Sequence, residues 1–397
     1  MILAIEPTWT GTVHASSNAA LLEVVSLAFP RQTIRVFADV THLNELQSSL
    51  GEASSSAFRF KSIQLSEVHR HKPHIVSLRR LHNEIQIVRR ALSHVASSED
   101  CLLILLSATS TSLLAADLFS RGRSGRTFIQ AVLHGNLNEL TGWRHRDPIK
   151  RRLDLRSMLC RNYRGRMRFL VLEEFVRSRL AVMRPATAQA TDVLPHPLAR
   201  PENMELSAPL AEPLRIGLVG LGSEEKGMGS FLRIAMQLRN IAGDKIRFHH
   251  VGSIVPGADA SLFEVLEETP STKHLTRSEF LLRINRLHYV VFPFRKNYYG
   301  LSASGAFLDA IAALKPIIAM RVPLTEQFFR EFGTLGYLCE NEAEMVSTIA
   351  DLASRLDSAA YDAQVDILRT ARSMRLPETL ALRYRDLVMK NLPGFAA

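Results

Sequence analysis

Short runs of apolar residues alternate along the chain with longer segments in which apolar residues recur every three or four positions. The short runs are typical of buried strands, and the longer segments are typical of amphipathic helices. In the first half the runs predict strands at Ile2–Ile5, Thr33–Phe37, Phe58–Ile63, Leu102–Leu106, Phe128–Leu133, Phe169–Leu172 and Thr191–Leu194. The predicted helices there are Asn18–Ala28, Pro73–His94, Thr111–Ser120 and Arg144–Arg161.

The second half repeats this alternation after a proline-containing stretch of little periodicity at 198–213. Its predicted strands are Arg215–Val219, Phe248–Val251, Tyr289–Phe294, Ile317–Met320 and Gly336–Cys339. Its predicted helices include Gly227–Ile241, Glu342–Arg355, Tyr361–Ser373 and Pro377–Lys390. Strands that alternate with helices predict parallel sheets, so we expect an α/β protein with two Rossmann-like domains. The expected domains are 1–200 and 214–375, with a linker at 201–213 and a final helical segment at 376–397.

Composition excludes several classes of protein. Hydrophobic residues are 46% and charged residues 22% of the 397 positions, as in soluble globular proteins, which excludes a disordered chain. The cysteines Cys101, Cys160 and Cys339 are far apart, which excludes a disulfide-rich scaffold and a zinc-binding cysteine cluster. The amino terminus lacks the pattern of a signal peptide, and no apolar run approaches the ~20 residues that span a bilayer. We expect a cytoplasmic protein that at most lies on a membrane surface.

Positive charge is concentrated in one segment. The net charge is +10, and between Arg144 and Arg168 ten lysines and arginines outnumber two aspartates. A helix here would place cations beside Leu155, Met158 and Leu159, which suits an anionic membrane surface. A solvated basic helix without a partner is the alternative. Nucleic acid is not expected as a partner, because few aromatic residues for base stacking lie here. The predicted membrane patch consists of Lys150, Arg151, Arg152 and Arg156.

Two segments of the second half carry residues suited to a phosphorylated ligand. In the first, RIGLVGLGSEEKGMGSFLRIA, a predicted strand leads through a glycine-containing turn to a helix. Gly220 and Gly222 allow the backbone to approach a phosphate, and Lys226 supplies a neutralising charge. A dinucleotide fingerprint fits poorly, because Glu225 occupies the place of its third glycine. The alternative is a tight strand–helix turn with an exposed lysine.

The second segment, VVFPFRKNYYGLSASGAFLDAIAALKPIIAM, runs from a strand through a basic and aromatic loop into a helix. Ser304 is a suitable N-cap, and the free N–H groups of the first turn, from Gly305 onward, bind anions. Asp309, one turn further, is placed to accept hydrogen bonds from ribose hydroxyls. The other candidate ligand-binding residues of this loop are Arg295, Lys296 and Tyr299.

Together these segments resemble the donor domain of GT-B glycosyltransferases, in particular the large retaining family 4 type. VGLGSEEKG, VVFPF, YYGLSASGAFLDAIAALKPIIA and GYLCENEAEM follow the family's order over about residues 213–350. The resemblance implies two Rossmann-like domains facing each other across a cleft, with the last helix returning to the first domain. It also implies sugar transfer from a nucleotide-diphosphate sugar without a metal or another cofactor. The diphosphate charge would be met by Lys226, a second cation and a helix N-terminus.

In the first half, the loop GTVHASSN and a histidine at a strand end are the candidates for acceptor binding and catalysis. The resemblance places this loop near the acceptor, with Gly11 and the Thr12-Val13 pair as contacts and His14 as a catalytic candidate. His134 ends a predicted strand and falls where the family often has a histidine near the reacting sugar. It is expected to hydrogen-bond the sugar or to act on the acceptor hydroxyl. A structural role is the alternative for both histidines.

The sequence departs from the family pattern at two places. The first glutamate of the E-x7-E motif has no counterpart, and Leu221 replaces an arginine that often accompanies the lysine. A retaining or inverting outcome therefore stays open. Family habit implies a lipid-linked or oligosaccharide acceptor in surface or exopolysaccharide assembly. A catalytically degenerate nucleotide-binding protein and a nucleotide-dependent oxidoreductase or epimerase are the alternatives.

Overall fold

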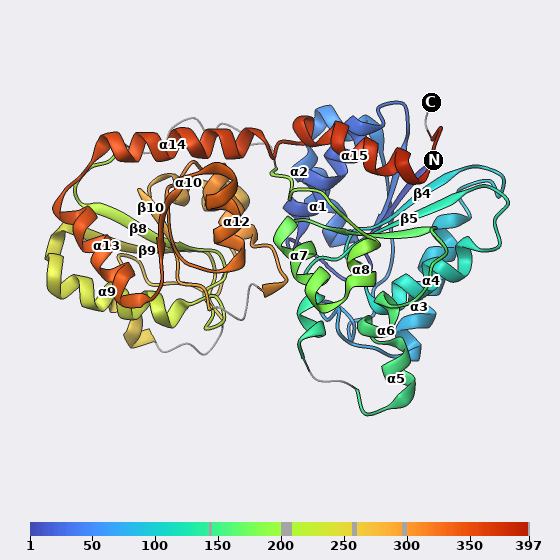
Figure 1. The fold of residues 1–397 in the computed structure, drawn as a ribbon, viewed down its shortest axis with the longest axis horizontal. Coiled ribbons are helices and arrows are strands. Elements are labelled where there is room, and N and C mark those ends of the chain that lie inside the picture. Colours follow the sequence, from blue (N-terminus) through green and yellow to red (C-terminus); the bar gives the residue numbers. More distant parts are fainter. Residues whose placement is uncertain (143–144, 200–208, 256–259, 296–299, 396–397) are drawn as a thin grey trace. The chain divides into compact units, whose positions relative to one another are not determined.

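The computed structural model describes residues 1–142, 145–199, 209–255, 260–295 and 300–395. The chain divides into two compact units (Figure 1). Unit 1 consists of Met1–Arg200, Leu301–Ala303 and Arg375–Ala397, and unit 2 of Pro201–Gly300 and Ser304–Met374. The predicted helix start at Arg144, the expected linker residues 201–208 and the candidates Lys296 and Tyr299 lie outside the described residues.

The described part of unit 1 contains a parallel sheet with the strand order β3-β2-β1-β4-β5-β6-β7. The neighbouring strands β1 and β4 at its centre are apolar over their whole length, and every residue of both is fully buried. Such continuous apolar strands are typical of a parallel sheet covered on both faces. The strands are β1 (Ile2–Ile5), β2 (Ile34–Ala38), β3 (Phe58–Ser62), β4 (Cys101–Leu105), β5 (Thr127–Val132), β6 (Met167–Val171) and β7 (Thr191–Val193).

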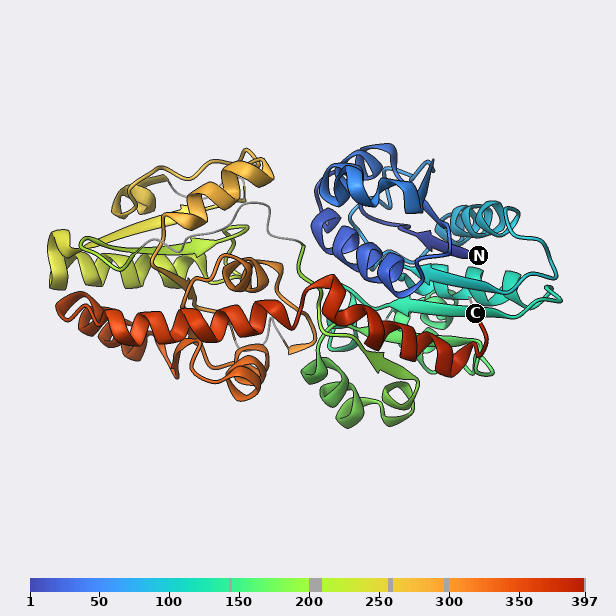
Figure 2. The same cartoon turned by 90° about the horizontal axis from the view of Figure 1, so that it is seen from above.

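Helices connect these strands, and the last helix of the chain packs on the first one (Figure 2). Tyr384 and Val388 of α15 lie in one buried cluster with Leu22 of α1 and Ile2 of the sheet. The helices are α1 (Ala15–Ala28), α2 (Val40–Ser54), α3 (Leu78–Leu92), α4 (Ser110–Ser120), α5 (Pro148–Leu153), α6 (Leu155–Leu159), α7 (Glu174–Met183), α8 (Pro185–Gln189) and α15 (Pro377–Asn391), with 3₁₀ turns η1 (Ser55–Ala57) and η2 (Leu137–Leu140).

A buried ion pair fixes the start of α15 in unit 1. Two guanidinium nitrogens of Arg375 donate to the two carboxylate oxygens of Glu173 at 2.7 and 3.0 Å, and both side chains are 1% exposed. The Arg375 carbonyl also accepts the N–H of Leu198. The segment before α15 is therefore bonded to the residues that follow β6 and β7.

Unit 2 is a second parallel sheet, with the order β12-β11-β10-β8-β9 among the described residues. Its strands are β8 (Leu214–Val219), β9 (Ile246–Val251), β10 (Tyr289–Phe292), β11 (Ile317–Met320) and β12 (Gly336–Cys339). Its helices are α9 (Met228–Ala242), α10 (Arg277–Asn285), α11 (Gly305–Ala312), α12 (Pro323–Phe332), α13 (Glu342–Ser354) and α14 (Ser358–Ser373), with 3₁₀ turns η3 (Gly243–Lys245) and η4 (Ala260–Val265).

The predicted strands are confirmed to within two residues at either end, and so is the α/β class with parallel sheets. Three predicted helix starts are wrong. Helices α1 and α14 each begin three residues earlier than predicted, at Ala15 and Ser358, and α3 begins at Leu78 instead of Pro73. The late start of α3 has a local cause, because the hydroxyl of Ser77 caps the helix by accepting the N–H of Arg80.

The single helix predicted at Arg144–Arg161 is also wrong in its described part. It is divided into α5 and α6 at Asp154, whose backbone is extended and whose carboxylate accepts the N–H of Ser157. Aspartate competes with the helical hydrogen bonds in this way and favours a cap over a helix interior.

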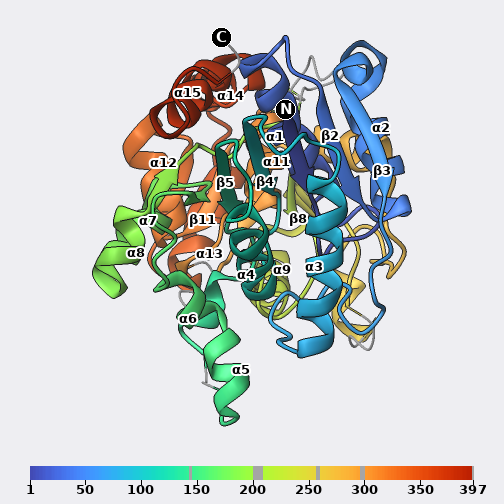
Figure 3. The same ribbon diagram turned by 90° about the vertical axis from the view of Figure 1, so that its right-hand side faces the viewer.

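This break also makes one prediction for the basic segment wrong, namely that Leu155, Met158 and Leu159 form an exposed apolar surface beside the cations. Leu155, Met158 and Leu159 are at most 4% exposed and belong to the core of unit 1. Arg156 points inward as well, since it donates to the carbonyls of Glu139, Leu140 and Gly142. The exposed cations Lys150, Arg151 and Arg152 lie on α5, which projects from the body of unit 1 (Figure 3). Within the described residues, no helix combines the length and apolar character needed to cross a bilayer.

Candidate functional site

Three histidines lie together at one edge of the sheet of unit 1. His14 ends the loop after β1, His134 follows β5 and His196 follows β7. The carboxyl ends of parallel strands meet at the same edge. The ring centroids of His14 and His134 are 4.2 Å apart and those of His134 and His196 are 5.6 Å apart, both edge to face. The structure thus brings together the two predicted catalytic residues and adds His196 to them.

Two of these imidazoles are neutral at physiological pH. Burial, and to a smaller extent the neighbouring His196, lower the pKa of His134 to about 3. Burial also lowers the pKa of His196 to about 4, and its Nδ1 donates to the carbonyl of Pro197 at 2.9 Å. A neutral histidine ring can accept a hydrogen bond from a sugar hydroxyl. A pKa of about 3 makes His134 suited to orienting such a hydroxyl rather than to removing its proton.

The lowered pKa of His134 predicts an acid-sensitive stability. In the unfolded chain this histidine binds a proton below pH ~6.5, whereas in the folded chain it does not. The free energy of unfolding should therefore fall as the pH drops from 7.5 to 5, and His134→Gln should reduce that fall by about 1–2 kcal/mol. Urea unfolding followed by tryptophan fluorescence at both pH values measures it. His82→Gln, at an exposed position on α3, is the control; an equal pH dependence in all three proteins would contradict the prediction.

Glu6 fixes the loop that carries His14. Its fully buried carboxylate accepts the N–H groups of Thr8 and Trp9 and the side-chain amide of Asn18, at 2.9–3.1 Å. Burial nevertheless raises the pKa of Glu6 to about 7. His14 itself has φ of 59°, a left-handed conformation that a non-glycine residue adopts only where its surroundings enforce it. The Trp9 ring packs on the His14 ring with centroids 4.6 Å apart.

Gly11 shapes this loop through its backbone. It has φ of +57°, its N–H donates to Thr41 Oγ1, and its carbonyl accepts from His42 Nδ1, both at 2.9 Å. Thr12 is exposed and Val13 is partly exposed. Acceptor contacts by Gly11, Thr12 and Val13 stay predictions.

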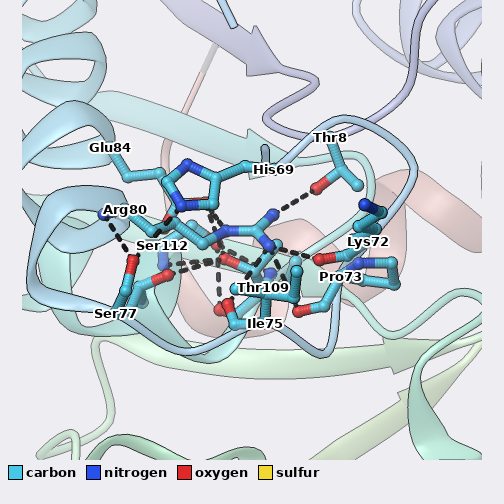
Figure 4. Close-up of polar contacts among 12 residues, drawn as sticks. Thr8, His69, Lys72, Pro73, Ile75, Ser77, Arg80, Glu84, Thr109 and Ser112 are labelled. Carbon is cyan, nitrogen blue, oxygen red and sulfur yellow. Dashed lines mark hydrogen bonds and ion pairs between the residues drawn. The ribbon is translucent and has the colours of Figure 1, made fainter. Parts of the chain in front are cut away.

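A buried arginine holds the neighbouring loop (Figure 4). Arg80 is 1% exposed; its Nη1 donates to the carbonyls of Lys72 and Ile75, and its Nη2 donates to Thr8 Oγ1 at 3.0 Å. Its Nε pairs with Glu84 at 2.9 Å. Arg80 therefore ties the loop before α3 to the loop after β1, and no local pattern in the sequence signalled it.

In unit 2, glycines allow two loops to approach each other closely. A Cβ on Gly220, which has φ of +97°, would lie 3.0 Å from the Cβ of Ala306 in α11. A Cβ on Gly227, at φ of +88°, would lie 2.2 Å from the carbonyl oxygen of Pro293 after β10. Gly222 is likewise confined, because a Cβ added to it would lie 2.9 Å from Cγ2 of Ile254. The turn after β8 thus lies against the first turn of α11 and the end of β10.

Lys226, Asp309 and Arg277 form a charged group at this edge of the sheet. Burial lowers the pKa of Lys226, and the charge of Asp309 opposes that shift. Burial raises the pKa of Asp309, while Arg277 lowers it through an ion pair of 2.7 Å. Asp309 was predicted to accept hydrogen bonds from ribose, yet the structure pairs it with Arg277. A ribose hydroxyl would share this carboxylate with the arginine.

The remaining candidates lie around α11. Ser304 is confirmed as its N-cap, since its hydroxyl accepts the N–H of Phe307. Gly305 is exposed at the first position of the helix, where a Cβ would meet open space. The first N–H groups of a helix lack intrahelical acceptors, so a ligand can approach them here. Arg295, a candidate second cation, pairs with Glu224 at 2.8 Å, with both side chains largely exposed.

No family model and no curated protein matches the sequence. Solved structures do match. A glycosyltransferase from Rickettsia africae has a TM-score of 0.66 at 13% identity, covering 99% of this chain and 98% of that chain. HepE of Anabaena in complex with UDP matches with a TM-score of 0.63 at 14% identity, and the match covers 98% of this chain and 99% of HepE. α,α-Trehalose 6-phosphate synthase from Burkholderia multivorans matches with a TM-score of 0.63 at 10% identity, and the match covers 100% of this chain and 96% of that chain. The fold is GT-B.

Identities this low establish the GT-B fold alone, and the fold expected from the sequence motifs is confirmed. Sequence reasoning missed one charged residue of the group at this edge of the unit 2 sheet. Arg277 supplies a cation beside Asp309, and its guanidinium lies 5.5 Å from the ring centre of Phe280. The sequence did contain a signal for it, because Arg277 is the first residue of α10 and follows the capping residue Thr276. Within the described residues, no group of three His, Cys, Asp or Glu could hold a metal ion; metal independence stays a prediction.

Proposed function

We propose that this protein is a glycosyltransferase that moves a sugar from a nucleotide-diphosphate sugar to an acceptor, without a metal. The observation that carries this proposal is the turn after β8, which holds Lys226 at the carboxyl edge of the unit 2 sheet and lies against the first turn of α11, the helix of Asp309. Lys226, Arg277 and the N-terminus of α11 would stabilise the negative charge that develops on the departing diphosphate. HepE, a GT-B neighbour, is solved with UDP, which supports the same ligand class here.

Unit 1 would hold the acceptor, with the neutral His134 accepting a hydrogen bond from a sugar hydroxyl. A lipid-linked or oligosaccharide acceptor in surface or exopolysaccharide assembly accords with the family resemblance. The exposed cations Lys150, Arg151 and Arg152 would then attach α5 to an anionic membrane surface. We propose that the protein acts in the cytoplasm, peripheral to the inner face of the plasma membrane, and that it has no nucleic-acid partner.

A thermal-shift titration tests the donor class. The protein is titrated with UDP, GDP, ADP, CMP and dTDP, beside NAD and NADP, with EDTA and again with Mg²⁺. One nucleoside diphosphate is expected to stabilise the protein in EDTA, by about 2.7 kcal/mol at 100 times its dissociation constant. Release of that nucleotide from its sugar conjugate, with an acceptor extract present, then tests transfer.

Three outcomes would count against the proposal. Stabilisation only by NAD or NADP would indicate an oxidoreductase or epimerase. Stabilisation that requires Mg²⁺ would contradict the metal-independent part. Nucleotide binding without sugar transfer to any acceptor would favour a catalytically degenerate protein, which the Arg277–Asp309 pair and the missing first glutamate make the strongest alternative.

A further inference from the structure

The first turn of α2 holds the backbone of Gly11, which lies three residues before His14. Thr41 Oγ1 accepts the Gly11 N–H, and His42 Nδ1 bonds the Gly11 carbonyl, both at 2.9 Å. Thr41 is itself fixed, because its hydroxyl donates to Asp39 Oδ1 at 2.7 Å. Two neighbouring side chains therefore occupy both backbone groups of this left-handed glycine, and the loop between β1 and α1 is bonded at its centre.

The bond from His42 to the loop determines which ring nitrogen carries a proton. A carbonyl only accepts hydrogen bonds, so Nδ1 of His42 must be the donor to Gly11. The side chain is fully buried, burial lowers its pKa, and a helix N-terminus disfavours a positive charge. The ring is therefore neutral, and its Nε2 is an acceptor. Free histidine favours the other tautomer, with the proton on Nε2, so the fold must impose this one.

Asn18 of α1 supplies the donor that this tautomer requires. Its Nδ2 lies 3.1 Å from His42 Nε2 and 2.9 Å from Glu6 Oε2, and its side chain is 2% exposed. The two amide hydrogens thus serve one acceptor each. A flipped amide would place Oδ1 against the Glu6 carboxylate, acceptor against acceptor. Glu6 therefore fixes the amide of Asn18, and this amide fixes the ring of His42.

We propose that His42 and Asn18 are positioning residues for His14, in a relay that runs from Glu6 through Asn18 and His42 to the Gly11 carbonyl. Each side chain of the relay has one orientation that satisfies the next, so the ends of β1 and α1 determine where the loop lies. His14 needs such support, because its φ of 59° persists only where the surroundings enforce it. The inference rests on the proposed function for the role of His14, whereas the loop contacts do not.

Nitrogen-15 NMR of the histidine side chains, without nucleotide, tests the tautomer of His42. The pH is 8, above the pKa of about 7 to which burial raises Glu6, so that its carboxylate can accept from Asn18. The signals that are missing from His42→Asn identify the ring. We expect a protonated Nδ1 and an unprotonated Nε2. A proton on Nε2, alone or together with one on Nδ1, would overturn the proposal.

Hydrogen exchange of residues 8–14, followed by mass spectrometry, tests how the relay acts on the loop. Asparagine places its amide nitrogen near the position of histidine Nδ1, whereas glutamine places it near that of Nε2. His42→Asn therefore keeps a donor to Gly11 and should exchange like the wild type. His42→Gln loses that donor and should exchange about tenfold faster. Asn18→Leu should also exchange faster, whereas Asn44→Leu, at an exposed position on α2, is the control that should not.

Equal exchange in His42→Asn and His42→Gln would overturn the proposal, because a role in packing alone does not distinguish the two nitrogens. Unchanged exchange in a folded Asn18→Leu variant would do the same for the relay. Thermal unfolding of each variant shows whether it is folded, and the tautomer of the wild type still decides if one is not.

The reaction itself gives a separate readout. Where sugar transfer is measured, His42→Gln should lower kcat about as much as His14→Ala does, with the affinity for the nucleotide unchanged. An unaffected kcat would overturn the positioning role. The NMR and exchange experiments contain no nucleotide, so their failure is distinguishable from failure of the nucleotide titration.

Discussion

Replacing Lys226 by alanine is expected to weaken nucleoside diphosphate binding by about 10–100-fold, the usual contribution of a hydrogen bond to a charged group. Loss of kcat/KM should be larger, on the order of 10²–10³-fold, because negative charge on the diphosphate increases as the sugar departs. The lysine is half-buried, which lowers its pKa, so an anion that binds it displaces less water than at an exposed side chain. Calorimetric titration with the stabilising nucleotide and initial rates of sugar transfer measure the two effects.

Lys245→Ala is the matched control for this variant. Lys245 lies in η3, directly before β9 and therefore at the amino edge of the same sheet, and its side chain is exposed. Removing one positive charge there should change nucleotide affinity by less than twofold, because long-range interactions between exposed charges are screened by salt. Equal losses in both variants would show a general effect of net charge. An unchanged affinity of Lys226→Ala would remove the lysine from the diphosphate site.

The tight turn after β8 in unit 2 could be predicted because its determinants are close together in the sequence. Gly220, Gly222 and Lys226 follow a strand within seven residues, and each glycine has a steric reason in the fold. The cap at Ser304 is local as well, since its hydroxyl bonds a backbone group three residues on. Apolar runs located the strands for the same reason, because burial of a parallel strand acts on consecutive residues.

Pairs of side chains from distant segments could not be predicted. Arg277 and Asp309 come from different helices, α10 and α11, and only the tertiary fold brings the arginine within ion-pair distance of the Asp309 carboxylate. Arg80 is the clearest case, since an arginine in an amphipathic helix normally faces solvent. It is buried because the loop before α3 supplies carbonyls and the loop after β1 supplies the Thr8 hydroxyl for it. The left-handed His14 is also a consequence of packing, here against Trp9.

Arg375→Ala is expected to lower the free energy of unfolding of unit 1 by about 3–5 kcal/mol, because it leaves the Glu173 carboxylate buried without its main partner. The two groups are 202 residues apart in sequence, and the pair joins α15 to the residues after β6. Both tryptophans of the chain, Trp9 and Trp143, belong to residues 1–200. Urea unfolding followed by tryptophan fluorescence therefore reports on unit 1 even if unit 2 unfolds separately.

An exposed ion pair nearby in the sequence, Arg177–Glu174, is the control for the loss of a buried pair. Arg177 and Glu174 are 3.1 Å apart with nearly half of each side chain exposed, so Arg177→Ala should cost less than about 1 kcal/mol. Arg375→Met combined with Glu173→Leu should recover most of the stability lost in Arg375→Ala, since it removes both charges and retains apolar volume. If Arg375→Ala behaves like Arg177→Ala, water reaches Glu173 and the pair does not hold α15. If the double variant is no more stable than Arg375→Ala, the contribution of Arg375 comes from its packing and its backbone bond to Leu198.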